Sequence, residues 1–354
     1  MNYFKLYANC ILVRGIKNSL IYDLYLGRYY TLPEELAVLL EELESNSYEN
    51  TLKIHHEYQS EITSFCEELI ELGYADWFRK EELNLYVKMN LDWDYPAQIT
   101  NIIVEHENEQ VIKDVLFICD ELLTHAVLIK HKGKINNLLL RLKCFDDSIV
   151  SQIEIITDNF IFQDLKNKDS VRLKNIWVKN FNKKNQVVNE KIKALSKRRY
   201  FKQERPRMDL FTESQKHHAY FNRKLYIGTK GEIKNAPECE EEFGNINEIK
   251  NIEDLKTIIS SSEFQKYWLV HKEMCDVCKD CEFRHMCVDN RVPSQRKDGS
   301  WYHQQECNYN PYISKWKGEE GYQNLRDIGV VSDKKIYHRD DEKITAINEV
   351  LWSK

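Results

Sequence analysis

The feature that most constrains this chain is a group of four cysteines near its C-terminal end. Cys278, Cys281 and Cys287 are separated by two and then by five residues, and Cys307 follows twenty residues later. Three thiols in a tight loop, joined by a fourth from a returning strand, suit the four-sulfur coordination of Zn²⁺ or of a [4Fe–4S] cluster. The spacing therefore predicts a metal or cluster site with these four cysteines as ligands. The alternative is that they are buried in a core or joined in disulfides.

Composition indicates a folded, water-soluble protein. The chain has 354 residues, 42% of them hydrophobic, which predicts two or three domains with real cores. Its net charge of −6 gives no general reason to bind nucleic acid or anionic membrane. The N-terminus lacks the order of a signal peptide, and no apolar run could span a bilayer. We therefore expect a cytoplasmic location, where reduced thiols favour metal binding over disulfides.

Residues 1–78 form the first predicted unit. Short runs rich in Tyr, Ile and Leu favour strands, and leucines at helical spacing follow. Pro33 suits a helix start, and Gly73 suits a helix end. This order of elements is winged-helix-like. We expect strands over residues 6–13, 19–24 and 27–31 and helices over 33–43 and 57–72.

The central part of the chain alternates predicted strands with helical patterns, which indicates a parallel sheet or an incomplete (β/α) barrel. It is too short for a closed barrel of about 250 residues. A polar, aromatic connection over residues 74–96 precedes it, and residues 136–145 suit either helix or strand. We expect strands over residues 99–104, 126–130, 153–157 and 173–178 and a helix over 110–123.

A basic stretch follows, over residues 172–207, where thirteen lysines and arginines meet only Glu190 and Glu204. We expect a solvated helix surface there. The alternative is a patch for an acidic peptide, an acidic partner or a phosphate-bearing ligand.

Two motifs give residues 1–78 a family resemblance. Residues 21–24 read Ile-Tyr-Asp-Leu and residues 27–30 read Gly-Arg-Tyr-Tyr, followed by the leucine-rich helix. This unit resembles the PqqD-like peptide-recognition domain of enzymes that modify ribosomally made peptides. The resemblance implies a groove, framed by strand 19–24 and helix 57–72, where an extended leader peptide adds a strand. The alternative is that these surfaces pack on the next domain. The peptide-binding residues would be Ser19, Leu20, Ile21, Tyr22, Asp23 and Leu24.

The C-terminal part carries a second resemblance. A predicted hairpin over residues 223–234 precedes the cysteines; residues 217–224 read His-His-Ala-Tyr-Phe-Asn-Arg-Lys and 278–284 read Cys-Lys-Asp-Cys-Glu-Phe-Arg. This part resembles the SPASM domain of radical S-adenosylmethionine peptide maturases. The resemblance implies that the four cysteines hold one auxiliary [4Fe–4S] cluster. A second auxiliary cluster is not expected, because Ala236 and Arg291 stand where that family has ligand cysteines. His217 and His218 are expected to be exposed.

The radical-generating motif is missing as well. The sequence contains no Cys-x3-Cys-x2-Cys, and Cys119 lies on the apolar face of a predicted helix, which indicates core packing. We therefore expect no S-adenosylmethionine and no radical chemistry. The whole chain resembles the SPASM-domain peptide maturase of grasp-with-SPASM systems, a pseudo-radical-SAM protein. The implied domains are a recognition domain (1–78), a degenerate, shortened β/α domain (97–205), a SPASM domain (206–318) and a tail (319–354).

This resemblance implies an accessory protein of peptide maturation, which binds the leader peptide and assists an ATP-grasp ligase. Its cofactor would be one [4Fe–4S] cluster, with Zn²⁺ as the alternative. Two other functions stay open: a peptide-modifying enzyme that uses the cluster for electron transfer, and a zinc-stabilised nucleic-acid-binding protein. Alternative ligands or neighbours of the site are Cys275, Cys239, His285 and His303.

Overall fold

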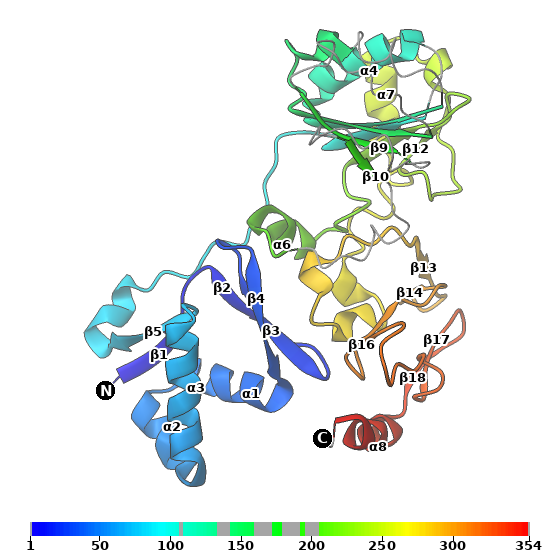
Figure 1. Cartoon of the computed structure of the whole chain (residues 1–354). Helices are drawn as coiled ribbons and strands as arrows, with labels where there is room; N and C mark the ends of the chain where they lie inside the picture. The colour runs from blue at the N-terminus through cyan, green and yellow to red at the C-terminus, as the bar shows by residue number, and fades with distance from the viewer. Residues whose placement is uncertain are drawn as a thin grey trace. The chain divides into compact units, whose positions relative to one another are not determined.

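The structure is a computed structural model that describes residues 2–105, 109–132, 142–158, 172–178, 192–194 and 205–352. The fold is mixed α/β, as the sequence predicts (Figure 1). The chain divides into two compact units. The first unit comprises residues 1–93, 203–219 and 270–354, and the second comprises residues 94–202 and 220–269.

The first unit begins with strands followed by helices. The strand expected over residues 6–13 is interrupted at residues 7–9 and is shared between two sheets, and the helix Tyr48–Ile54 was not predicted; the other predicted elements of this region are present. Three strands form an antiparallel sheet in the order β2-β3-β4, in which Ile21 lies opposite both Leu12 and Tyr30. A separate antiparallel pair joins β1 to β5, a strand that the sequence did not predict. The bounds are β1 (Asn2–Leu6), β2 (Cys10–Val13), β3 (Asn18–Asp23), β4 (Arg28–Pro33), α1 (Glu34–Ser45), α2 (Tyr48–Ile54), η1 (His56–Tyr58), α3 (Gln59–Glu71), β5 (Ala75–Arg79) and η2 (Lys80–Leu85).

Local chemistry explains the helix ends here. Helix α1 starts directly after Pro33 and has Glu34 and Glu35 in its first turn, where carboxylates interact favourably with the helix dipole. Helix α3 is followed by Gly73 with φ of +74°, a left-handed conformation that glycine adopts without strain. One face of β3 and the buried faces of α1 and α3 form a core that includes Ile21, Leu40 and Phe65.

The opposite face of β3 also packs inside the first unit. Leu20, Tyr22 and Leu24 contact a second core, to which Phe211 of α6 (Met208–Ser214) and Met286 contribute. Strand β3 is therefore covered on both faces.

The C-terminal part of the first unit contains little regular structure. Three single 3₁₀ turns precede short hairpins, and a small core around Tyr312, Ile328 and Ile344 holds the last hairpin and helix α8. Helix α8 lies in the tail that the sequence places after residue 318. The bounds are η8 (Lys272–Met274), η9 (Cys278–Asp280), η10 (Arg284–Met286), β13 (Pro293–Gln295), β14 (Trp301–His303), β15 (Tyr309–Asn310), β16 (Lys315–Trp316), β17 (Val330–Ser332), β18 (Tyr337–Arg339) and α8 (Asp341–Trp352).

The second unit is built on a seven-stranded sheet in the order β10-β9-β8-β7-β6-β11-β12. All neighbouring strands are parallel except the β11–β12 hairpin, which confirms the predicted parallel sheet and hairpin. Helices α4 and α7 lie on the same side of this sheet (Figure 1). The bounds are β6 (Asn101–Val104), α4 (Glu109–Leu122), β7 (Ala126–His131), η3 (Leu142–Phe145), β8 (Gln152–Thr157), β9 (Leu173–Val178), β10 (Ile192–Ala194), β11 (Lys224–Ile227), β12 (Ile233–Lys234), η7 (Ile246–Glu248) and α7 (Ile252–Ile259).

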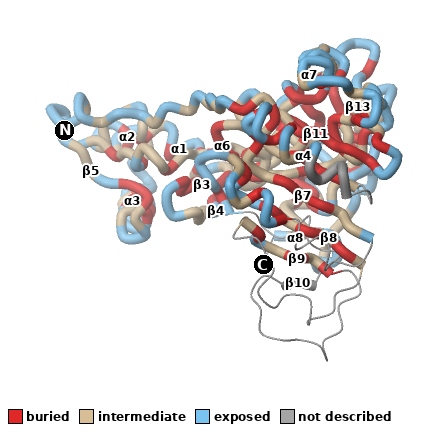
Figure 2. Tube along the Cα trace, turned by 90° about the horizontal axis from the view of Figure 1, so that it is seen from above, coloured by how far each residue is buried: buried red, intermediate tan, exposed pale blue. Residues whose placement is uncertain are grey.

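The hairpin expected beside the cysteines belongs to this sheet. Strand β11 pairs with β6, placing Leu225 opposite Ile102, and all four of its residues are buried (Figure 2). The predicted SPASM domain, residues 206–318, is consequently divided between the two units. The basic stretch was expected to be a helix surface, but its described parts include strands β9 and β10. Residues 179–191 and 195–204 of it lie outside the described residues, as do residues 136–141. No helix in the described part of the chain is long and apolar enough to cross a bilayer.

Candidate metal centre

The four predicted ligands lie on the irregular segment that we call the cysteine loop, residues 272–309. Its backbone folds into single 3₁₀ turns: the N–H of Cys281 donates to the carbonyl of Cys278 at 3.1 Å, and the N–H of Arg284 donates to that of Cys281 at 3.3 Å. Val277 precedes the first ligand with φ of +66°, which is strained for a β-branched residue. Such strain costs about 1–3 kcal/mol and occurs mainly at functional sites.

The four cysteines lie within electrostatic reach of one another. Burial raises the pKa of the Cys281 thiol, and Glu282, Cys287 and Cys307 raise it further. Burial likewise raises the pKa of Cys287, with added contributions from Cys307 and Cys278. Each thiol therefore lies close enough to others to oppose their ionisation. A bound cation would reverse this effect, because metal ligation stabilises the thiolate form.

Two N–H donors point toward sulfur atoms of this group. The backbone N–H of Tyr309 donates to Cys307 Sγ at 3.4 Å, and Arg291 Nη2 lies 3.9 Å from Cys278 Sγ. Hydrogen bonds to sulfur favour thiolates and tune the clusters that thiolates hold. The donor set thus fits a thiolate-ligated metal group.

Buried charges lie beside the sulfurs. Lys272 Nζ and Arg291 Nη2 each donate to Asp289 Oδ2 at 2.6 Å, and the Asp289 side chain is 1% exposed. Although burial opposes ionisation, Lys272 and Arg291 hold the pKa of Asp289 well below its usual range. Two buried cations share one carboxylate, so this network carries excess positive charge. Ionised cysteines would supply the missing negative charge, since an uncompensated buried charge is costly.

A mixed set of ligand atoms also occurs here. Among the described residues, Cys278, Asp289 and His303 place one ligand atom each within 4.8 Å of one another. The ammonium group of Lys272 already serves as the cation of this set, because it donates to Asp289 and lies 3.3 Å from His303 Nε2. Sequence reasoning considered His303 and missed Asp289 and Lys272.

The other candidate ligands lie in different surroundings. His285 has partners at both ring nitrogens, Ser214 Oγ at 3.0 Å from Nδ1 and Glu273 at 3.4 Å from Nε2. Cys275 is fully buried, and burial, followed by Cys278, raises its pKa to about 12. Cys239 is buried in the second unit.

Two further expectations concern cysteine and histidine placement. Cys119 packs in the core beneath α4, as predicted. The expectation that His217 and His218 are exposed is wrong: His218 is 1% exposed, and the His217 ring lies 5.1 Å from that of Trp93.

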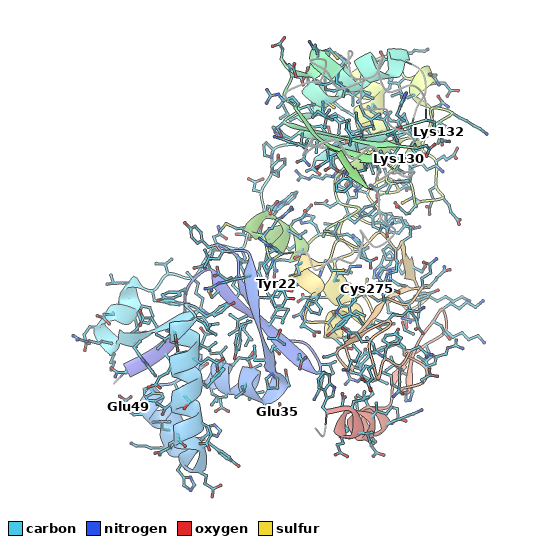
Figure 3. All side chains as sticks on the ribbon, in the orientation of Figure 1. Tyr22, Glu35, Glu49, Lys130, Lys132 and Cys275 are labelled. Atoms are coloured by element: carbon cyan, nitrogen blue, oxygen red, sulfur yellow. The ribbon has the colours of Figure 1, made fainter. Side chains whose placement is uncertain are left out.

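The expected peptide groove is placed wrongly by sequence reasoning. Strand β3 is the central strand of its sheet, so both of its edges are already paired and it cannot accept an added strand. The Tyr22 hydroxyl donates to the carbonyl of Glu282 at 2.7 Å, which ties β3 to the segment that follows Cys275 (Figure 3). The outer strands of the sheet are β2 and β4. All six predicted contact residues are buried: Ser19, Leu20, Ile21, Tyr22, Asp23 and Leu24.

Comparisons with known proteins place the chain in no family. No family model, no curated protein and no solved structure matches it.

Proposed function

We propose that this chain is an accessory protein in the maturation of a ribosomally made peptide, and that its four cysteines hold one [4Fe–4S] cluster. It would bind the leader segment of the precursor and assist an ATP-grasp ligase. The observation that carries this proposal is the convergence of Cys278, Cys281, Cys287 and Cys307 beside a buried network of excess positive charge.

The family resemblance favours a cluster over a single zinc ion. With Zn–S bonds of about 2.3 Å, tetrahedral geometry places sulfurs about 3.8 Å apart. No three of the four sulfurs, all of them in described residues, lie within 4.8 Å of one another. A cube spreads its ligands over four iron atoms, so its cysteine sulfurs lie farther apart than those around one zinc ion. Zn²⁺ is the alternative occupant.

The site suits a structural role. Four protein thiolates leave no open position for substrate, and the cysteine loop has only single 3₁₀ turns and short strands to hold it. Metal binding would supply folding free energy that this segment lacks. Since the loop covers one face of β3, the same binding would stabilise the N-terminal sheet.

Strand β4 offers the edge for peptide binding. It is an outer strand, Thr31 and Pro33 on it are exposed, and the Tyr30 hydroxyl donates to Glu68 of α3 at 2.8 Å. An extended peptide that paired with β4 would lie beside α3. Strand addition supplies backbone hydrogen bonds at every second residue of the peptide.

Metal content tests the first half of the proposal. Anaerobically purified protein should contain about four irons per chain and lose most of them when any one of the four cysteines is replaced by serine. Cys144→Ser is the matched control, because Cys144 is exposed and lies in the other unit. Protein that holds neither iron nor zinc, or equal metal loss in the control, would contradict the metal centre.

Peptide binding tests the second half. Fluorescence anisotropy would measure the affinity for a labelled leader peptide of the proposed precursor class. N-methylation removes one peptide N–H at a time, so successive positions should alternate between weakened and unchanged binding if the leader adds as a strand. Absence of binding, or weakening without a two-residue period, would refute strand addition.

A further inference from the structure

A cavity of about 590 Å³ adjoins the candidate metal centre within the first unit. Cys278, Cys307 and His303 line it, together with residues of the segment around β17. Its volume lies in the range of sites for small molecules. Cys281 and Cys287 do not line it, so the cavity is a separate space beside the four sulfurs.

The rim of this cavity carries positively charged side chains that form no ion pair within the described residues. Arg326, Lys334 and Lys335 line it and are exposed, and none of the three has an ion-pair partner among the described residues. Of the carboxylates that line the cavity, Asp276 pairs with Arg296 at 2.6 Å. Asp333 accepts the backbone N–H groups of Lys335 and Ile336 at 2.8 and 3.1 Å, which leaves its negative charge in place.

Glu306 is the remaining carboxylate of the lining, and in the described part of the chain it has no ion-pair partner. The rim therefore carries three cations against two carboxylates without an ion-pair partner, Asp333 and Glu306, a balance of one positive charge. This balance favours a ligand with negative charge.

His303, which lines the cavity, carries a buried hydrogen-bond donor without a partner among the described residues. The His303 side chain is 4% exposed, and its Nε2 lies 3.3 Å from the ammonium group of Lys272. Because an ammonium group can only donate, Nε2 accepts and the ring proton of neutral His303 resides on Nδ1. That Nδ1 has no hydrogen-bond partner among the described residues. A buried donor left unpaired costs about 1–3 kcal/mol; because Nδ1 has almost no exposed surface, an acceptor atom of a ligand would recover this cost once the ring turns toward the cavity.

We infer that this cavity binds a small organic polyanion. Its charged groups would contact Arg326, Lys334 and Lys335 at the rim, and one acceptor oxygen would approach His303. Carboxylate and phosphate groups share this chemistry. The site does not depend on the proposed peptide role, because every group that defines it belongs to the protein.

Calorimetric titration at low ionic strength, with citrate as the carboxylate probe and pyrophosphate as the phosphate probe, tests this inference. We expect one of the two to bind with a stoichiometry of one per chain, and the tighter probe identifies the class of ligand. The variant Arg326→Gln/Lys334→Gln/Lys335→Gln should weaken that binding about tenfold or more, since partly exposed charge pairs contribute up to about 1 kcal/mol each.

The matched control is Lys53→Gln/Lys80→Gln/Lys317→Gln, which removes three positive charges at exposed positions that do not line the cavity. It should bind the probe like the unmodified protein. Equal weakening in the control, or no binding of either probe to the unmodified protein, would overturn the inference. Metal content measured on the same samples separates the two proposals, because the rim variant should keep its metal while Cys281→Ser should lose it.

Discussion

Replacing Asp289 by asparagine should destabilise the first unit strongly, and more so without metal than with it. The substitution keeps the size of the side chain and removes the one carboxylate that Lys272 and Arg291 share at 2.6 Å. The Lys272 side chain is 4% exposed and that of Arg291 is 13% exposed, so water cannot compensate either charge well. Breaking a buried ion pair in this way typically costs about 3–5 kcal/mol.

In the metal-loaded protein the cost should be smaller. Four thiolates around a zinc ion or an iron–sulfur cube keep a net negative charge, which offsets part of the repulsion between the two cations. The difference between the loaded and the metal-free protein therefore measures how strongly the buried network is coupled to the centre.

Urea unfolding followed by tryptophan fluorescence measures both values. The first unit holds five of the seven tryptophans, so the signal reports mainly on it: Trp77, Trp93, Trp301, Trp316 and Trp352. Asp94→Asn is the control, because Asp94 is exposed and should change the free energy of unfolding by less than about 0.5 kcal/mol. A loss below about 1 kcal/mol in the metal-free Asp289→Asn variant, or the same loss in both states, would refute this reasoning.

Three further predictions concern other contacts of the first unit. Tyr22→Phe should cost about 1–3 kcal/mol in urea unfolding, because it leaves the buried carbonyl of Glu282 without its donor; an unchanged midpoint would contradict this. The pKa of Glu273 is lowered to about 2 by its hydrogen bond to His285, against the effect of burial and with help from Arg284. Its folded pKa lies below the unfolded value of 4.5, so its stabilisation is present above pH 4.5 and disappears as the pH falls toward 2. Glu273→Gln should thus lower the thermal midpoint of metal-free protein at pH 6 and leave it unchanged near pH 2; equal effects at both would count against the ion pair. Burial, and then Glu67, raise the pKa of Cys66 to about 12, so iodoacetamide at pH 8 should alkylate exposed Cys144 and spare Cys66, as peptide mass mapping of the folded protein would show.

Local sequence patterns were sufficient to predict most strands of the second unit, but not β10, which lies in the basic stretch where a helix surface was expected. The runs that form β7, β8 and β9 are rich in isoleucine and valine and are bounded by polar residues. Such runs favour buried parallel strands wherever they lie in a chain. The order of the strands in the sheet was harder to predict. Strand β11 pairs with β6 across more than a hundred residues, and no local signal specifies that pairing.

The position of β3 could have been predicted better. Leu20, Ile21 and Tyr22 are three consecutive apolar residues, whereas a strand with one solvated face alternates apolar and polar side chains. That run indicates a strand buried on both faces, which is poorly suited to binding a peptide. The resemblance to a recognition domain implied that a peptide binds at β3, whereas the outer strands of this sheet are β2 and β4.

The charged part of the site could not be predicted from the sequence. Lys272 and Asp289 stand in a segment rich in charged residues, where most such side chains are solvated. Only the fold brings them within 2.6 Å of each other and removes both from water. The four cysteines were easier to find, because their spacing is unusual by itself.

The contact between Tyr22 and Glu282 has a consequence for the synthesis of this chain. The two residues are 260 positions apart, so a ribosome adding about 5–20 residues per second needs about 13–50 s to make the second after the first. During that time one face of the nascent sheet has no partner from the cysteine loop. This is the face formed by Leu20, Tyr22 and Leu24. The emerging chain would therefore present an apolar surface to chaperones until its C-terminal third is made.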